Sequence, residues 1–291
     1  MVLSPKEITL SVLSMQIGKN DIQANGKLTN VLSWFISDEK LSGNLNVTST
    51  YLNLNDFMKK DSSAVKDTLP MLAFKIPKNL DLSLKAKGKT VQFSKLIMND
   101  VLANMTVKDG RVTISNLSAN ALGGSMVVNG YYESIVADKP EVSLGLNMQH
   151  VSFTETFKTF TMAKALVPVF EKTKGDFSLK ILFNSSLNKY MDPDLSSLTG
   201  NGLLQSQNVR ISGIKAMDLL ATTLNRESLK NIVPKDLKIA FSISKGKMKT
   251  SPFTINIGET RLGFEGSTGI DKTIDYNVNV SLPKSITGNI V

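Results

Sequence analysis

The stretch from Gly110 to Met148, GRVTISNLSANALGGSMVVNGYYESIVADKPEVSLGLNM, decides the fold because a related stretch recurs near the C-terminus. When the two are aligned without a gap from Gly246 onward, Gly130 meets Gly266 and the alternating apolar positions coincide. Internal self-similarity of this kind indicates supersecondary units that cannot bury their apolar faces alone. The sequence therefore predicts a fold assembled from repeats.

A third copy lies near the N-terminus, where Ile17 to Gly26, IGKNDIQANG, aligns on Ile257 to Gly266, IGETRLGFEG. The pair Asn129-Gly130 has the composition of a tight hairpin, but its counterparts in the other copies fall inside alternating segments. A glycine in the middle of a strand is typical of a bulge or bend. We expect these recurring glycines to curve a sheet.

Alternating apolar residues dominate from Ile8 to Ile36 and predict half-buried strands. Turn signals of Asp and Lys separate such segments, and we expect the strands they join to be antiparallel. Asp109-Gly110 is the strongest hairpin signal, since this pair supplies the positive φ values of a two-residue turn. Val107 should face Val112, and Met105 should face Ile114.

Two segments have helical spacing. Phe153, Phe157 and Phe160 form an aromatic stripe that is typical of a core, and Pro168 should break or restart that helix. The second segment has apolar residues from Ile214 to Leu224, with Ser212 as the expected N-cap. We expect both helices to cover the end or the open face of a sheet.

The expected fold class is mainly β: a repeated, curved antiparallel sheet, groove-like or sandwich-like, with two short helical inserts. The expected organisation is an N-terminal β repeat at 1–57, a linker or mobile loop at 58–77, a central β repeat at 78–152, a helical insert at 153–175 and a C-terminal β repeat at 176–291 with a helix near 213–231. The prolines at 70 and 77 close the polar linker.

The composition excludes several kinds of site chemistry. The chain has no cysteine and one histidine, His150, so disulfides, thiolate nucleophiles and zinc–cysteine sites are excluded. Asp192 and Asp194 are the nearest carboxylate pair that acid–base catalysis could use, but around Pro193 they are typical of a turn. We expect a protein without enzymatic activity, cofactor or metal.

The net charge of +9 comes from thirty lysines and four arginines. Nucleic-acid binding depends on arginine forks and stacked aromatics, so we predict no nucleic-acid partner. The scattered lysines predict a solvated surface or, alternatively, attraction to anionic lipid headgroups. No apolar run approaches the roughly 20 residues of a membrane helix. The start lacks the pattern of a signal peptide, and both ends resemble the interior of a longer chain.

The order of these segments resembles the C-terminal region of the AsmA-like proteins. The residues that carry the resemblance are IPKNLDLSL at Ile76 to Leu84, KDGRVTISNLSANALGGSMVVNG at Lys108 to Gly130, GNGLLQSQNVRISGIKAMDLL at Gly200 to Leu220, and the block from Gly246 to Pro283. The resemblance implies a Gram-negative envelope protein that projects into the periplasm from an N-terminal inner-membrane anchor, which is not in this sequence. The family is related to bridge-like lipid transfer proteins, whose repeated sheets curl into a groove with an apolar floor.

The residues alone lead to a compatible hypothesis, since a repeated sheet must hide its apolar face against a second sheet, helices or acyl chains. We expect a non-catalytic periplasmic module for envelope lipid homeostasis, which shields or guides the acyl chains of phospholipid or another envelope lipid between the inner and outer membranes. The alternative is a periplasmic scaffold or outer-membrane assembly factor that acts through contacts with envelope proteins. The candidate groove residues are Leu82, Leu84, Met126, Val128, Leu144, Leu146, Leu262, Phe264, Val278 and Val280.

Overall fold

The computed structural model describes residues 2–3, 7–57, 75–135, 139–188, 191–207, 209–271 and 273–282. The chain forms two compact units. Unit 1 comprises Met1–Ala121, Ser125–Leu146 and Phe183–Asp194, and unit 2 comprises Leu122–Gly124, Asn147–Leu182 and Leu195–Val291. The chain is mainly β, with antiparallel strands in a curved sheet and short helical inserts, as the alternation predicts.

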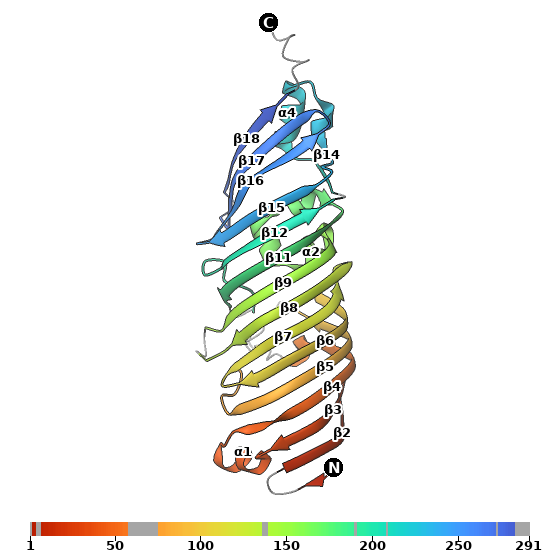
Figure 1. Cartoon of the computed structure of the whole chain (residues 1–291), viewed down its shortest axis with the longest axis vertical. Helices are drawn as coiled ribbons and strands as arrows, with labels where there is room; N and C mark the ends of the chain where they lie inside the picture. Colours follow the sequence, from red (N-terminus) through yellow and green to blue (C-terminus); the bar gives the residue numbers. More distant parts are fainter. Residues whose placement is uncertain are drawn as a thin grey trace, which may run out of the picture. The chain divides into compact units, whose positions relative to one another are not determined.

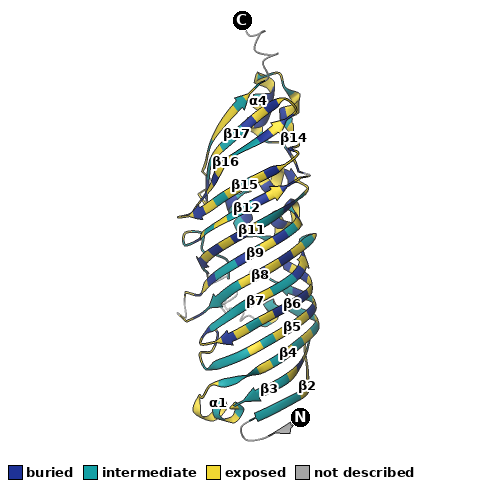
Figure 2. Ribbon diagram, in the orientation of Figure 1, coloured by how far each residue is buried: buried dark blue, intermediate teal, exposed yellow. Residues whose placement is uncertain are grey.

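In unit 1 the strands lie side by side in chain order (Figure 1). Its elements are β1 (Val2–Leu3), β2 (Glu7–Ile17), β3 (Asn20–Thr29), α1 (Val31–Ser37), β4 (Leu41–Asn53), the 3₁₀ turn η1 (Leu54–Phe57), β5 (Leu80–Phe93), β6 (Leu96–Lys108), β7 (Arg111–Ala121), β8 (Gly124–Glu133) and the first half of β9 (Glu141–Ser152). Buried and exposed residues alternate along many of these strands (Figure 2).

One strand pair in unit 1 departs from the antiparallel prediction. β4 and β5 are parallel, with Leu45 opposite Leu84. A parallel neighbour requires the chain to return to the same end of the sheet, so it needs a long connection rather than a tight turn. The polar segment at 58–77 provides that length, and its residues 58–74 lie outside the described residues.

The prediction of strands up to Ile36 is wrong at its end. β3 stops at Thr29, and Asn30 takes a left-handed conformation with φ of 62°, which asparagine tolerates better than most residues. A short helix, α1, then runs from Val31 to Ser37. A brief apolar run fits a strand or a helix equally well, so periodicity could not separate the two.

Unit 2 combines strands with the helical inserts. Its elements are α2 (Phe153–Thr159), α3 (Thr161–Leu166), the 3₁₀ turn η2 (Pro168–Lys172), β10 (Thr173–Lys174), β11 (Asp176–Ser186, which ends in unit 1), β12 (Thr199–Ser206), β13 (Arg210–Ser212), α4 (Lys215–Thr223), η3 (Glu227–Lys230), β14 (Asn231–Ile232), β15 (Leu237–Ser244), β16 (Lys247–Ile257), β17 (Thr260–Gly269) and β18 (Ile274–Ser281). β10, β13 and β14 form a separate three-stranded sheet.

The first helical insert packs on β11 through aromatic rings. The ring centroid of Phe153 lies 4.7 Å from that of Phe170 and 4.4 Å from that of Phe177. Pro168 begins η2, as expected. The helix breaks earlier as well, since Phe160, which the aromatic spacing placed inside it, is extended between α2 and α3. In the second insert Ser212 is not the N-cap, because it ends β13, and the cap position of α4 falls on Ile214, without a side-chain hydrogen bond.

The three sequence repeats are three hairpins of matching dimensions. β2, β7 and β16 each have 11 residues, and their partners β3, β8 and β17 each have 10. The aligned glycines, Gly26, Gly130 and Gly266, all lie inside strands. The ladder shifts by one residue beside Gly26 and again beside Gly266, which confirms that these glycines mark bulges.

The predicted hairpin at Asp109-Gly110 is also confirmed. Val107 pairs with Val112, and Met105 pairs with Ile114. Both turn residues have positive φ, 50° at Asp109 and 83° at Gly110, as a two-residue hairpin turn requires. Among the helices that the structure describes, none is long and apolar enough to cross a membrane.

Candidate functional site

One face of unit 1 is apolar across six neighbouring strands. Residues paired in adjacent strands point to the same side of a sheet, so the register can be followed from β2 to β7. Three such rows are Ile8, Leu28, Gly43, Leu82, Val107 and Val112; Leu10, Gly26, Leu45, Leu84, Met105 and Ile114; and Leu13, Ala24, Val47, Ala86, Ala103 and Leu117. We call this set the apolar face.

The opposite side of the same strands is polar. The rows that alternate with those of the apolar face are Thr9, Lys27, Asn44, Ser83, Thr106 and Thr113, and Asn25, Asn46, Lys85, Asn104 and Asn116. A sheet with one polar and one apolar side can leave the polar side in water and needs a cover only on the apolar side. The apolar face is therefore the side of unit 1 that requires a cover.

The described residues of unit 1 provide only part of that cover. Every member of the central row, from Leu10 to Ile114, is half-buried, whereas Ala103 in the next row is buried. At the β2 end Leu13 remains 40% exposed. The second, three-stranded sheet lies in unit 2, so within the described part of unit 1 the apolar face has no second sheet packed against it.

The dimensions of the apolar face suit an acyl chain. Five strand spacings of about 4.8 Å carry each row across roughly 24 Å. One acyl layer of a bilayer is half of its hydrocarbon core, about 15 Å deep. A row of the apolar face is therefore long enough for one acyl chain. Each buried CH₂ contributes about 0.8 kcal/mol, so a chain along one row would be held by many small apolar contacts and by no single residue.

Six of the ten candidate groove residues lie in unit 1. Leu82 and Leu84 belong to the apolar face and are half-buried. Met126 and Val128 on β8 are buried, and Leu144 and Leu146 on β9 are half-buried. Sequence reasoning did not select Leu45, Val47, Met105 or Ile114 for this face, although the alternation around each of them was visible.

The other four candidates form two cross-strand pairs in unit 2. Leu262 on β17 pairs with Val280 on β18, and Phe264 pairs with Val278. Leu262 is fully buried, whereas Val278 is 42% exposed. The ring of Phe264 stacks on that of Phe253, with centroids 5.2 Å apart. This part of the sheet thus has both a packed row and an accessible one.

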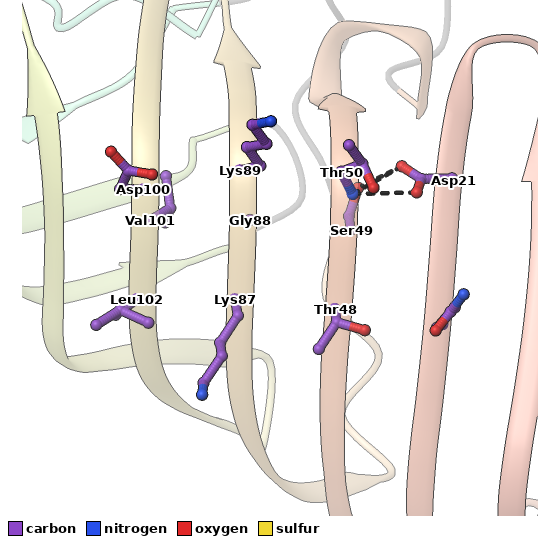
Figure 3. Close-up of a pocket in the computed structure, with 11 residues that line it drawn as sticks. Asp21, Thr48, Ser49, Thr50, Lys87, Gly88, Lys89, Asp100, Val101 and Leu102 are labelled. Atoms are coloured by element: carbon purple, nitrogen blue, oxygen red, sulfur yellow. Dashed lines mark hydrogen bonds between the residues drawn. The ribbon is translucent and has the colours of Figure 1, made fainter.

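A hollow of about 410 Å³ lies on unit 1, lined by residues of β3 to β6 (Figure 3). At its rim Asp21 accepts hydrogen bonds from the backbone N–H groups of Tyr51, at 2.7 Å, and Thr50, at 2.9 Å. The Ser49 hydroxyl donates to the same carboxylate at 3.1 Å. The bonds from Tyr51 and then Thr50 hold the pKa of Asp21 far below its ordinary value.

The Asp21 carboxylate has a structural explanation. The ladder between β3 and β4 ends at the pair of Gln23 and Thr48, and beyond it the two strands exchange no further backbone pairs. Asp21 and Asn20 then bind the backbone N–H groups of β4 in place of a strand neighbour, with Asn20 accepting from Asn53 at 2.6 Å. A carboxylate committed to these donors is a poor general base.

The fold brings a Ser, a His and an Asp together on β9 and β11, in unit 2. His150 Nδ1 lies 3.1 Å from Asp176 Oδ2, but the Ser178 hydroxyl accepts from the backbone N–H of His150 at 3.3 Å and not from its ring. The His150 side chain is 79% exposed. A nucleophilic serine needs the imidazole itself as its base, so this arrangement differs from a catalytic triad.

Asp192 and Asp194 lie where a turn was expected. The Asp192 carbonyl accepts from the Asn188 N–H, the Asp194 N–H donates to the Ser186 carbonyl, and Leu187 bridges to Pro193. Among the described residues no group of three or more His, Asp or Glu side chains is placed to hold a metal ion.

Comparison of the chain with known protein families, with curated proteins and with solved structures finds no match.

Proposed function

We propose that this chain is a non-catalytic lipid-handling module, in which the apolar face shields the acyl chains of a phospholipid or a related envelope lipid. The observation that carries the proposal is that three apolar rows each cross all six strands from β2 to β7, while the rows that alternate with them on the other side are polar. A face of this length that is only half-buried favours an apolar ligand.

The resemblance to the AsmA-like proteins supports the same proposal and extends it. On that analogy the module belongs to an inner-membrane-anchored protein of the Gram-negative envelope and works in the periplasm, guiding lipid between the two membranes. The repeated hairpins support a face that lengthens by adding units, as in repeat proteins generally.

The lipid proposal is tested by site-specific photocrosslinking. A photoreactive amino acid is placed at Leu84, on the apolar face, or at Ser83, its neighbour on the polar side. In Gram-negative cells we expect lipid adducts at Leu84 and none at Ser83. Equal adducts at both positions, or none at either, would contradict an acyl-shielding face.

A second candidate function is a scaffold or outer-membrane assembly factor, and the edge of β2 favours it. Among the described residues β1 pairs only with Ile8 and Thr9, so the rest of β2 has a strand neighbour on one side only. Val12 on this edge is 73% exposed. An exposed edge strand can add a strand from another protein.

The scaffold function predicts a stoichiometric protein partner without bound lipid. That partner should be lost in Val12→Lys, because a lysine on an edge strand opposes strand addition. Purification of the wild type and Val12→Lys from cells, with protein and lipid analysed together, separates the two functions.

A further inference from the structure

The helix α1 exposes apolar side chains that the fold does not use. Phe35 is 74% exposed, Ile36 is 82% exposed and Leu32 is 53% exposed. Phe35 and Ile36 have the two highest exposures among the large exposed apolar side chains of the described residues. The exposed residues appear on α1 at one end of the strands of unit 1 (Figure 2). We call this cluster the α1 tip. Leaving its apolar side chains exposed to water is unfavourable.

The α1 tip has the composition of a membrane-interface contact. Its sequence, VLSWFIS, contains no charged residue and includes Trp34, the one tryptophan of the chain. The ring of Trp34 packs edge-on against that of Phe35, with centroids 4.7 Å apart. This contact supports the exposed Phe35 ring. Tryptophan, phenylalanine and leucine are the residues that short surface helices insert at the boundary between headgroups and acyl chains.

Two of the charged residues that follow α1 are paired with residues in the turns next to β5 and β6. Asp38 accepts from the Asn79 side chain at 2.6 Å, and the Lys40 ammonium pairs with Asp109 at 2.9 Å. Glu39, which follows the helix, adds negative charge and would oppose anionic headgroups. The three charged residues that follow α1 carry no net positive charge, so the attraction to a bilayer proposed below comes from apolar insertion.

The size of the α1 tip argues against a protein partner. A seven-residue helix is about 10 Å long, and three exposed side chains fall well short of the roughly 800 Å² that each partner contributes to a stable protein interface. Shallow insertion into a bilayer requires no such area. We propose that the α1 tip docks unit 1 on a lipid surface by inserting Leu32, Phe35 and Ile36. This proposal does not depend on lipid carriage by the apolar face.

The test uses Trp34 as a built-in probe. The protein is mixed with phosphatidylcholine vesicles that contain brominated lipid, and Trp34 quenching and vesicle co-flotation are measured. We expect quenching, with co-flotation that is unchanged between low and high salt. The double variant Phe35→Ser/Ile36→Ser keeps Trp34 and should lower the partition coefficient at least about tenfold.

The matched control is Leu219→Ser/Val233→Ser, which removes two exposed apolar side chains from unit 2, 70% and 52% exposed. It should bind vesicles like the wild type, and circular dichroism should show the same fold for all three proteins. Three results would overturn the proposal: no quenching in the wild type, binding that needs anionic lipid and disappears in high salt, or self-association that the α1 double variant abolishes. Failure of lipid crosslinking at Leu84 with intact vesicle docking would refute only the proposed function.

Discussion

At the scale of single residues, the glycines inside strands mark points where two backbones come too close for a side chain. A Cβ on Gly266 would lie 2.1 Å from the Asp275 carbonyl oxygen, and a Cβ on Gly26 would lie 2.1 Å from that of Asn44. Both contacts are with backbone, which cannot rotate away. The sequence alone predicted the bulges beside Gly26 and Gly266, because the same glycine recurs at the same place in each hairpin.

Two glycines of β17 give a matched test of this explanation. Gly266→Ala should lower the free energy of unfolding by about 2 kcal/mol or more, since the added methyl group forces the strands apart. Gly263→Ala should change it by less than about 0.5 kcal/mol, because its Cβ would meet Asn279 at an ordinary 3.7 Å. Thermal unfolding of both variants measures the difference. Equal losses would show that strand glycines act here through chain entropy and not through close approach.

Asp21 gives a prediction about pH. Hydrogen bonds from Tyr51 and Thr50 hold its folded-state pKa below the ordinary aspartate value of about 3.9. The carboxylate therefore stabilises the fold fully above that ordinary pKa, and the stabilisation is lost as the pH falls through the lowered one. Asp21→Ala should melt below the wild type at pH 7, and the gap should narrow at pH 3. A gap that stays constant or widens in acid would contradict this account.

At the scale of secondary-structure elements, the helical insert of unit 2 is held by its aromatic contacts with β11. Phe153 is 1% exposed, so Phe153→Ala should cost about 3–5 kcal/mol. Phe157, on the same helix, is half-buried, and Phe157→Ala should cost roughly 1 kcal/mol. Chemical denaturation of the two variants checks the ranking. The reverse order would mean that the insert packs through a different side of α2.

The elements that the sequence predicted well are those with a local signal. Asp109-Gly110 fixes both the turn and the register around it, and Pro168 fixes the end of α3 and the start of η2. The parallel pairing of β4 with β5 has no such signal, because it depends on where the chain returns after a long polar segment. α1 was missed because seven residues are too few for a helical period to be distinguished from alternation.

At the scale of the whole molecule, the apolar face was only partly visible in the sequence. Alternation identified Leu82 and Leu84, but strand pairing is what aligns Leu45 and Met105 with Leu84 and, through Gly26, brings Leu10 into the same row. Cross-strand order is set by pairing, which a single sequence does not encode locally. In the proposed function many half-buried positions would share the binding of an acyl chain, so no single motif in the sequence is expected to identify this face.

The most direct test of the central claim is native mass spectrometry, with lipid extraction, on protein purified without detergent from a Gram-negative host. Three proteins are compared: the wild type, Leu84→Asp on the apolar face, and Ser83→Asp, which adds the same charge on the polar side. A lipid-shielding face predicts bound phospholipid in the wild type and in Ser83→Asp, and at least about tenfold less in a folded Leu84→Asp, because a carboxylate beside an acyl chain is costly. Lipid-free wild-type protein with a cooperative melt, or equal lipid in all three proteins, would contradict it.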